Sequence, residues 1–396
     1  MKLYEFEGKK IFKKVGIKVP NSFLISKVEQ IKKIPQNFFP VVAKVQVLSG
    51  GRAARGGIVI CKNPRELQFG ARKLLGANFY GEKITKILVE KKINVEKEYY
   101  FSVTYDTLTR TPALLVSKKA GTGIESFEKK FTLNPLKAFD REKAEKFLLD
   151  SDFPKEEVSK LSEILVKLVR LFYGFDARLA EINPLAKSNN QFFALDSKII
   201  LDDAALYRHP ELKFSARSAT GAQPSKAEIE AAKIDQNDHR GVAGSIYFDL
   251  KGDIGILASG GGGSLVALDG VLAAGGKPAN YTEYSGNPPA EKVYKLTKIV
   301  LSKRGLSGLL VAGAVANFTD IYETLRGFLE ALREVRPKFP IVVRRAGPRD
   351  KEAFGVLEKA AKEEGFDFHL FGAETPIDKS AQIIVKLAKE YKSKAH

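Results

Sequence analysis

The segment from Ile254 to Ser264 reads IGILASGGGGS and constrains the fold more than any other part of the chain. A short apolar segment of strand length, Ile254–Ala258, runs into four glycines, and a helical pattern follows over Leu265–Ala274. Glycines between a strand and a helix allow a sharp turn and a close approach of backbone N–H groups to a ligand. The N-terminus of the helix carries about half a positive charge. These features predict an anion-binding loop.

The same alternation of strand and helix continues toward the C-terminus. Apolar segments of strand length at Gly308–Ala312, Pro340–Arg344 and Asp367–Phe371 are each followed by a helical pattern. Such alternation predicts a parallel, doubly wound sheet, whose ligands bind beyond the carboxyl ends of the strands. Polar clusters lie at or just beyond other expected strand ends: Glu283–Gly286, Asn317–Thr319 and Arg344–Gly347. We therefore expect four loops to form one pocket for a polyanion.

The first half of the chain predicts a mixed α+β domain. Helical patterns cover Leu3–Val15 and Lys155–Tyr173. Segments typical of strands lie at Pro40–Val47, Ile87–Glu90, Glu98–Tyr105 and Pro112–Lys118, with a hairpin at Arg178–Ala186 and Phe192–Asp196. The polar segment Glu211–Arg240 is expected to be a linker with a short helix. We therefore expect a first domain at 1–240, with its linker at about 211–240, and a second domain at 241–396.

The composition is that of a chain with real apolar cores and no membrane span. Of the 396 residues, 44% are hydrophobic, and no run of about 18 apolar residues occurs. The one cysteine, Cys61, excludes a disulfide framework and fits a reducing compartment. Because the first residues, MKLYEFEGKK, lack the apolar core of a signal peptide, we expect a cytoplasmic protein.

The net charge of +18 leaves two interpretations open. A nucleic-acid-binding protein needs basic residues that cluster with aromatic residues on one face. The lysines of this chain are instead spread along predicted helices, often beside glutamate, as in Lys143–Lys167 and Lys379–Lys394. This pattern favours a solvated surface with sites for anionic ligands, which a basic field attracts. A nucleic-acid-binding or scaffold protein is the alternative.

The segment Val41–Gly57, VVAKVQVLSGGRAARGG, places a lysine on a strand before a loop rich in glycine and arginine. Lys44 on the strand can reach a nucleotide phosphate, and the loop can close over phosphates with its backbone N–H groups. An ordinary basic hairpin is the alternative interpretation of this segment.

A set of hard oxygen ligands follows in the expected hairpin. Glu181, Asn183 and Asp196 can face one side together, and carboxylate and amide oxygens suit Mg²⁺. A capped hairpin with surface acids is the alternative. Glu90 and Glu98, which flank a strand end, can bond an adenine amine and a ribose. The four histidines share no motif, so we expect any covalent carrier to lie on another chain.

Several segments of the chain resemble a known family. LYEFEGKKIFKKVGIKVP, VVAKVQVLSGGR, ILVE with Glu98 eight residues after Glu90, and AEINPLAK followed by ALDSK are similar to the nucleotide-binding β-subunits of succinyl-CoA synthetases. The resemblance implies an α/β protein with an α+β ATP-grasp domain over about 240 residues, followed by a flavodoxin-like CoA-ligase domain with a parallel sheet.

The resemblance also implies roles for residues of the first half. ATP would be held by residues of the strand, of its loop and of a later strand: Lys44, Gly51, Arg52, Ala53, Glu90 and Glu98. Asn183 and Asp196 would bind Mg²⁺, with Glu181 as a catalytic carboxylate beside them. The chain departs from the family at Ala53, where glycine is usual, and at 118–125, where the family favours an acidic, double-glycine sequence.

The second half is more similar to the matching domain of ATP citrate lyases and citryl-CoA synthetases. The segments that carry this resemblance are SGGGGS, ANYTEYSGNP, VVRRAGP, FGAETP and the Asn317–Thr319 cluster. The implied citrate pocket consists of Gly260, Gly261, Gly262, Ser285, Gly286, Asn317, Thr319 and Arg345, with Asn317 and Thr319 also catalytic. Citrate has one carboxylate and one hydroxyl more than succinate, and an arginine fork, an amide and a hydroxyl can satisfy these groups.

The resemblance implies an ATP- and Mg²⁺-dependent ligase subunit that forms citryl-CoA through citryl phosphate. A partner similar to the succinyl-CoA synthetase α-subunit would carry a phosphohistidine and bind most of the CoA, either alone or fused to a citrate-synthase-like module. We therefore expect a hetero-oligomer, either a citryl-CoA synthetase or an ATP citrate lyase, of the reductive tricarboxylic acid cycle. Succinyl-CoA synthetase is the alternative enzyme.

Overall fold

The computed structural model describes residues 1–121, 129–214, 224–236 and 238–394. The chain divides into two compact units, Met1–Gln223 and Pro224–His396. The division precedes α5 (Lys226–Lys233), which packs on α7 (Ala290–Leu301) and β13 (Tyr247–Asp249) of the second unit rather than forming part of a linker. Part of the expected linker and half of the segment 118–125 lie outside the described residues.

The first unit contains a smaller antiparallel sheet with the strand order β1-β6-β2-β3. Its strands are β1 (Ser22–Ile25), β2 (Val41–Val45), β3 (Ile58–Cys61) and β6 (Ile87–Lys91). One face packs on α2 (Pro64–Leu74) and two 3-10 helices, η1 (Val28–Lys33) and η2 (Gln36–Phe38). Helix α2 begins after Asn63, whose side chain accepts a hydrogen bond from the Glu66 N–H, and proline is its first residue. Asparagine is favoured at the N-cap of a helix, and proline is favoured at the first helical position. A short hairpin, β4 (Asn78–Phe79) and β5 (Glu82–Lys83), follows α2.

The larger sheet of the first unit is also antiparallel and has the order β11-β10-β7-β8-β9, with β12 also paired to β10. Its strands are β7 (Lys97–Asp106), β8 (Thr111–Ser117), β9 (Lys129–Thr132), β10 (Ala177–Ser188), β11 (Gln191–Ala194) and β12 (Lys198–Leu201). The helices α3 (Arg141–Asp150) and α4 (Lys155–Gly174) cover one face, because the apolar stripe of α4 fits the apolar residues of β7 and β10. A 3-10 helix, η3 (Asp203–Arg208), follows β12.

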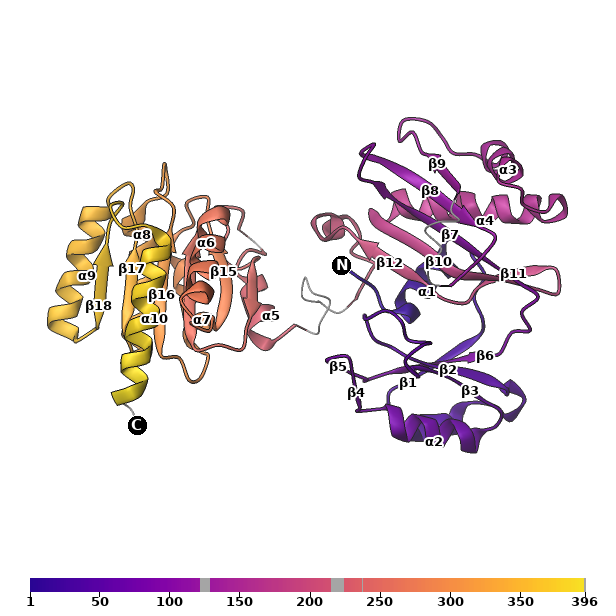
Figure 1. Ribbon diagram of the computed structural model, residues 1–396, viewed down its shortest axis with the longest axis horizontal. Helices are drawn as coiled ribbons and strands as arrows, with labels where there is room; N and C mark the ends of the chain where they lie inside the picture. The colour runs from indigo at the N-terminus through magenta and orange to yellow at the C-terminus, as the bar shows by residue number, and fades with distance from the viewer. Residues whose placement is uncertain (122–128, 215–223, 237, 395–396) are drawn as a thin grey trace. The chain divides into compact units, whose positions relative to one another are not determined.

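Helix α1 (Glu5–Lys14) lies between the two sheets (Figure 1). Ile11 and Phe12 belong to the core of the larger sheet, whereas Phe6 packs with Leu88 of the smaller sheet and with Leu48 of the loop after β2. The helix is therefore buried on more than one side, and its Glu5 and Lys9 are taken out of water. Charged groups in such a position need partners, and these partners build the site described below.

The second unit is a six-stranded sheet with the order β13-β15-β14-β16-β17-β18. After β13 its strands are β14 (Ile254–Ser259), β15 (Asn280–Tyr284), β16 (Gly308–Gly313), β17 (Ile341–Arg344) and β18 (Phe368–Phe371), and these five are parallel. The strands β14 to β18 have the order 2-1-3-4-5 of flavodoxin-like sheets. In this order β14 is the strand at which the chain reverses its direction across the sheet, and ligands bind at such a point.

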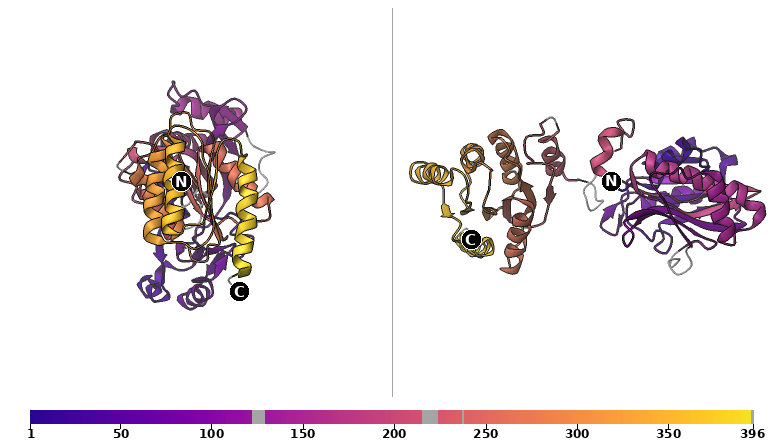
Figure 2. Two further views of the ribbon diagram at one scale, coloured as in Figure 1. Left: turned by 90° about the vertical axis from the view of Figure 1, so that its left-hand side faces the viewer. Right: turned by 90° about the horizontal axis from the view of Figure 1, so that it is seen from above.

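Helices cover both faces of this sheet (Figure 2, left view). α6 (Gly261–Ala273) and α10 (Ile377–Lys394) pack on one face. α7, α8 (Ile321–Val335) and α9 (Asp350–Glu364) pack on the other. Alternate residues of β14, β16 and β17 belong to the two cores; in β16, Leu310 and Ala312 face α10, and Leu309 and Val311 face α8.

Two expectations for the second unit need correction. β15 is a strand that the sequence pattern did not predict, although its last residues belong to the Glu283–Gly286 cluster. Helix α6 begins at Gly261 rather than at Leu265. Glycines are poor helix formers, but here the first helical turn packs against the loop after β16: a Cβ atom at Gly263 would lie 2.9 Å from the Ala314 nitrogen. Tertiary packing overrides propensity at this turn.

None of the helices in the described ranges is both long and apolar enough to span a membrane.

Candidate functional site

A cavity of about 670 Å³ lies between the two sheets of the first unit. All the residues that the sequence marked as nucleotide or metal contacts in this half of the chain line it: Lys44, Gly51, Arg52, Ala53, Glu90, Glu98, Glu181, Asn183 and Asp196. They come from β2, from the loop after it, from β6, from β7, from β10 and from the turn before β12. The fold therefore gathers residues that are up to 152 positions apart, from Lys44 to Asp196, around one space.

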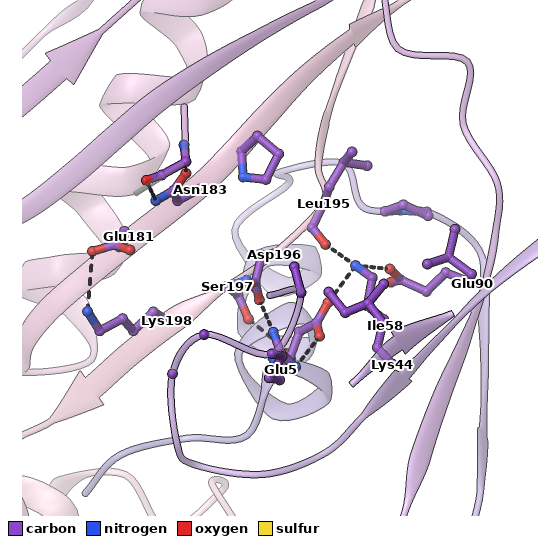
Figure 3. Close-up of a pocket in the computed structure, with 18 of the residues that line it drawn as sticks. Glu5, Lys44, Ile58, Glu90, Glu181, Asn183, Leu195, Asp196, Ser197 and Lys198 are labelled. Atoms are coloured by element: carbon purple, nitrogen blue, oxygen red, sulfur yellow. Dashed lines mark hydrogen bonds and ion pairs between the residues drawn. The ribbon is translucent and has the colours of Figure 1, made fainter. Parts of the chain in front are cut away.

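Lys44 is the buried cation of this cavity (Figure 3). Its Nζ lies 2.9 Å from Oε1 of Glu5 and 2.7 Å from Oε2 of Glu90, and it donates to the carbonyl oxygen of Leu195. Burial alone lowers the pKa of Lys44, but Glu5 and Glu90 outweigh burial and raise the pKa above its usual value. Lys44 is thus a fixed positive charge at the cavity wall.

Glu5 is a site residue that the sequence analysis missed, although it lies within the quoted N-terminal segment. Its carboxylate is 1% exposed and pairs with Lys9 at 2.7 Å, with Lys44 and, through Oε2, with Nη1 of Arg52 at 2.6 Å. Burial raises the pKa of Glu5, yet the cations outweigh burial and hold the pKa well below its usual range. An acid at a buried helix position beside an apolar stripe was the only signal that pointed to it.

Arg52 connects the loop after β2 to both sides of the cavity. Besides its pair with Glu5, it donates from Nη2 to Oδ1 of Asp196 at 2.7 Å. Burial lowers the pKa of Arg52, but the two carboxylates raise it above its usual value. The loop is also held from outside, because Glu82 accepts a hydrogen bond from the Leu48 N–H at 2.8 Å and Arg55 lies 3.8 Å from the centre of the Tyr80 ring.

Glu90 and Glu98 differ in what their carboxylates contact. Glu90 is buried and bridges Lys44 and Lys9, whose Nζ is 2.6 Å from its Oε1. Glu98 is exposed on β7 and lines the cavity. Contact with a ribose therefore suits the carboxylate of Glu98 better than that of Glu90, which already has two cationic partners.

Glu181 and Asn183 alternate on β10 with Ile182, whose side chain lies in the core, so both face the cavity. Asn183 accepts from the Gly121 N–H at 2.9 Å and donates to its carbonyl at 3.1 Å. Burial raises the pKa of Glu181, and the negative charge of Asp196 raises it further. Lys198, whose Nζ is 3.7 Å from Oε2 of Glu181, acts in the opposite direction without cancelling the rise.

The donor set in this part of the cavity suits a cation that keeps most of its own water. Within the described residues no group of three His, Cys, Asp or Glu side chains is arranged to hold a metal. Asp196 and Asn183 supply one carboxylate and one amide oxygen to the same cavity. Mg²⁺ is bound in this way, with a few protein oxygens and with nucleotide phosphates and water as the other ligands.

The second unit brings the four predicted loops together at the carboxyl edge of its sheet. The Gly260 N–H donates to the Tyr284 carbonyl at 3.1 Å, and the Ala316 N–H donates to the Ala346 carbonyl at 2.8 Å. Asn287 joins the loop after β15 to the loop after β16, because its Oδ1 accepts from the Asp320 N–H at 2.9 Å. Gly260 is the N-cap of α6, with φ of 81°. The predicted citrate residues therefore lie on four adjoining loops.

Arg345 has the most unusual environment of these loops. Its side chain is fully buried, and Nε, Nη1 and Nη2 have no hydrogen-bond partner among the described residues. Its guanidinium lies 5.5 Å from the centre of the Tyr284 ring, whose hydroxyl is likewise buried without a partner. The neighbouring Arg344 is satisfied by the carbonyls of Gly313 and Thr375. An unpaired buried cation is costly, and an anionic ligand would supply the missing partner.

The residues after β16 divide into a cap and two ligand candidates. Asp320 is the N-cap of α8 and accepts from the Glu323 N–H at 3.1 Å, so capping does not require Asn317 or Thr319. Asn317 is exposed and Thr319 is buried. Tyr284 was named only as a member of the cluster Glu283–Gly286, and Asn287 was missed; both lie in the quoted ANYTEYSGNP segment, but only their three-dimensional contacts single them out.

Comparisons with known proteins match both halves of the chain. Residues 2–187 match the family described as ATP-grasp domain. Residues 223–389 match the family described as ATP citrate lyase citrate-binding. The second match covers all four loops at the edge of the parallel sheet.

Curated relatives cover nearly the whole chain. An ADP-forming succinate–CoA ligase subunit beta of Desulfurococcus amylolyticus is 34% identical over 367 residues, which are 90% of this chain and 93% of the relative. A GDP-forming succinate–CoA ligase subunit beta of Thermus thermophilus is also 34% identical, over 90% of this chain and 93% of the relative. Among solved structures, ATP citrate lyase from Methanothrix soehngenii in complex with citrate and coenzyme A has the same fold, with a TM-score of 0.82 at 24% identity over 98% of this chain and 99% of that chain.

Proposed function

The chain belongs to the family of succinate–CoA ligase β-subunits and is an acid–CoA ligase-type enzyme, and from this premise we propose that it is the ATP-binding subunit of a ligase that activates citrate. The reaction would convert ATP, citrate and CoA into ADP, phosphate and citryl-CoA. The choice of citrate rests on one observation within the part that matches the citrate-binding family: the guanidinium of Arg345 is buried and finds no hydrogen-bond partner among the residues that the structure describes.

The first unit would bind and orient the nucleotide. Lys44 would contact the phosphates as a fixed cation, and Arg52 would hold the loop of Gly51 and Ala53 over them. Glu98 would form a hydrogen bond with the ribose. Glu90 would act mainly by holding Lys44 and Lys9 through its ion pairs with them. In this arrangement the phosphates meet a wall whose positive charges are already in place.

Asp196 and Asn183 would hold Mg²⁺, with Glu181 beside them as the predicted catalytic carboxylate. The metal ion would neutralise charge on the phosphates when bound. Asp196 must then share its carboxylate between the metal and Arg52, and Asn183 must exchange its contacts with Gly121. These residues are hydrogen-bonded in the free chain and are thereby held at the cavity wall.

The second unit would bind citrate and present one of its carboxylates for phosphorylation. Arg345 would pair with one carboxylate of citrate, and Asn317 and Thr319 would form hydrogen bonds with its remaining polar groups. The N-terminus of α6 at Gly260–Gly262 would face a further negative charge of citrate. Ser285 and Gly286 would lie beside this N-terminus. Succinate lacks the third carboxylate and the hydroxyl, so it would leave part of this polar set unsatisfied. Such mismatch disfavours an analogue strongly.

The carrier of the phosphoryl group would be a histidine of a partner similar to the succinate–CoA ligase α-subunit. No histidine is among the described residues that line the cavity of the first unit. CoA would bind mainly to that partner and attack citryl phosphate, so that the C–O bond to phosphate breaks as the thioester forms. A partner fused to a citrate-synthase-like module would then cleave citryl-CoA to acetyl-CoA and oxaloacetate.

The test is ADP release by this chain purified with its α-type partner in the presence of ATP, Mg²⁺ and CoA. Turnover with citrate and none with succinate is the expected result. Turnover with succinate alone would overturn the assignment of citrate while leaving the ligase intact. Oxaloacetate in the citrate reaction would identify a lyase, and citryl-CoA as the final product would identify a synthetase.

Succinate is the second candidate substrate, because the curated relatives at 34% identity are named succinate–CoA ligases. The same relatives leave the choice between ATP and GTP open, since both ADP-forming and GDP-forming members match equally well. The experiment above distinguishes citrate from succinate. Its repetition with GTP in place of ATP shows which nucleotide the enzyme uses.

A further inference from the structure

We propose that Glu5 is a positioning residue, which holds Lys44 and Arg52 in the orientation that the phosphates of the nucleotide require, and that Lys9 supports it from behind. This inference rests on the proposed function of the first unit and adds a residue to it that neither the motifs nor the comparisons assign.

Four charged side chains form a closed ring of alternating sign beside the cavity. Lys9 contacts Glu5 at 2.7 Å and Glu90 at 2.6 Å, and Lys44 contacts Glu5 at 2.9 Å and Glu90 at 2.7 Å. Both lysines also donate to the carbonyl oxygen of Leu195. Each carboxylate thus lies between two ammonium groups. Figure 3 shows one of the two, Lys44, with its partners Glu5 and Glu90.

Only one of the two lysines belongs to the cavity wall. Lys44 lines the cavity, and Lys9 is absent from its lining and is 4% exposed. Lys9 supplies a second positive charge to Glu5 and Glu90 from the side of α1. Without Lys9, the carboxylates of Glu5 and Glu90 would have only Lys44 and Arg52 as cationic partners. A buried charge without full compensation destabilises the folded chain.

Glu5 also connects parts of the chain that are far apart in sequence. Its carboxylate joins α1 to β2 through Lys44 and to the loop after β2 through Arg52. Arg52 in turn pairs with Asp196. The Glu5 carbonyl accepts from the Ser197 hydroxyl at 2.9 Å. Gly8 permits this approach, since a Cβ atom there would lie 2.5 Å from the Ser197 Oγ. Glu5 therefore fixes both walls relative to one another.

Glu5 itself is not suited to bind the nucleotide. Its carboxylate is negative, 1% exposed and already engaged by three cations. Glu5 lies at the cavity wall, but phosphates would be repelled by it, and its oxygens are already engaged by Lys9, Lys44 and Arg52. Its effect on nucleotide binding would pass through Lys44 and Arg52, whose charged groups lose their common anchor when Glu5 is neutralised.

The experiment compares nucleotide binding to the full chain with Glu5→Gln, by calorimetry with Mg·ATP and by displacement of a fluorescent ATP analogue with adenosine. We expect Mg·ATP to bind at least about tenfold more weakly to the variant, because misplaced phosphate contacts cost this much or more. Adenosine, which has no phosphates, should bind both proteins equally. Equal Mg·ATP affinity of the two proteins would overturn the inference.

The matched control is Glu157→Gln. Glu157 is a buried carboxylate of the same unit with three donors, Lys97, Lys187 and Tyr99, none of which is among the residues that line the cavity. It should lose stability without losing Mg·ATP affinity. Equal loss of Mg·ATP affinity in both variants would show a general effect of unfolding and would overturn the inference.

If Glu5→Gln does not fold, Glu5→Asp answers the same question. Aspartate keeps the charge and withdraws it by one methylene, so Lys44 and Arg52 would be displaced while Glu5's share of the charge balance is kept. We expect weaker Mg·ATP binding with unchanged adenosine binding here too, and unchanged Mg·ATP binding would overturn the inference. A parent chain that binds no ATP at all would instead refute the proposed function of the first unit.

Discussion

The guanidinium of Arg345 crosses directly over Gly313, so that a Cβ atom at position 313 would collide with Nη1 of the arginine. Gly313 is the last residue of β16, and its neighbour in the parallel sheet is Ser259, the last residue of β14. Arg345 therefore reaches the point where the chain reverses across the sheet only because the strand that it crosses ends in glycine.

This contact predicts that Gly313→Ala displaces Arg345 and damages the citrate site specifically. We expect the KM for citrate to rise by about tenfold or more, because the added methyl group cannot fit without moving the guanidinium. The affinity for Mg·ATP should not change. Gly355→Ala on α9 is the control, since a Cβ atom there meets nothing within 4 Å; if both variants keep the parental KM, Arg345 does not bind citrate.

Arg345→Met should separate stability from activity. The guanidinium is buried and has no hydrogen-bond partner in the described parts of the chain, so its replacement by an apolar side chain of similar length should stabilise the free chain, by roughly 1 to 4 kcal/mol. Citrate-dependent turnover should be lost while Mg·ATP affinity is retained. Urea unfolding and steady-state kinetics together check this prediction, and a variant that is both less stable and fully active would contradict it.

Asn287→Gly should loosen the link between the loops after β15 and β16. The side-chain oxygen of Asn287 accepts from the Asp320 N–H, and its φ of 55° is one that glycine adopts without strain. We expect a rise in the KM for citrate with no change for Mg·ATP. Asn190→Gly, in the β10–β11 turn at φ of 60°, is the matched control and should leave both constants as they are.

Asp196→Asn should raise the Mg²⁺ concentration that half-saturates turnover by at least about tenfold, as losses in a metal site commonly do. The amide has the shape of the carboxylate but not its charge, so Arg52 also loses one of its two anionic partners. A Mg²⁺ titration at fixed ATP measures the shift. Asp150→Asn, at an exposed position of α3, should show none, and an unshifted Asp196→Asn would refute the metal assignment.

The Glu5 carboxylate should make the first unit sensitive to acid. Its pKa in the folded chain is held well below the ordinary value by Lys44, Lys9 and Arg52 against the effect of burial. A lowered folded pKa gives stability that is complete above the unfolded pKa of about 4.3 and is lost as the pH falls below it. Urea unfolding between about pH 3 and pH 6 should therefore show a gap between parent and Glu5→Gln that shrinks toward acid. A gap that does not depend on pH would contradict the prediction.

Local patterns in the sequence predicted the long elements α4, β7 and β10 of the first unit and most strands of the second, but not β1, β3, α2 or α7. The alternation of strands and helices after Gly252 predicted four of the five parallel strands, because hydrophobic periodicity is set by neighbours along the chain. The same patterns failed where packing overrides propensity, at the glycine-rich first turn of α6, and at β15, whose polar residues hide a strand that is buried on alternate positions.

The chemistry of the cavity was likewise visible in part. Lys44, Arg52, Asn183 and Asp196 lie in segments whose residue types suit phosphates and Mg²⁺, and the structure gathers them in one cavity. Glu5 and Lys9 lie on an ordinary-looking amphipathic helix, and no spacing rule links them to Lys44, 39 residues after Glu5, or to Glu90, 81 residues after Lys9.

The sequence by itself determined the order of the elements, the two-unit organisation and the residue types available for anions and metal ions. Only the tertiary structure decided which charges are buried and which of them are paired. The charges of Glu5, Lys9, Lys44 and Glu90 compensate one another inside the protein, whereas the guanidinium of Arg345 has neither an ion pair nor a hydrogen bond with any described residue. Periodicity is a property of neighbours along the chain, but the energy of a charge depends on its distance to other charges and to water, which the fold alone sets.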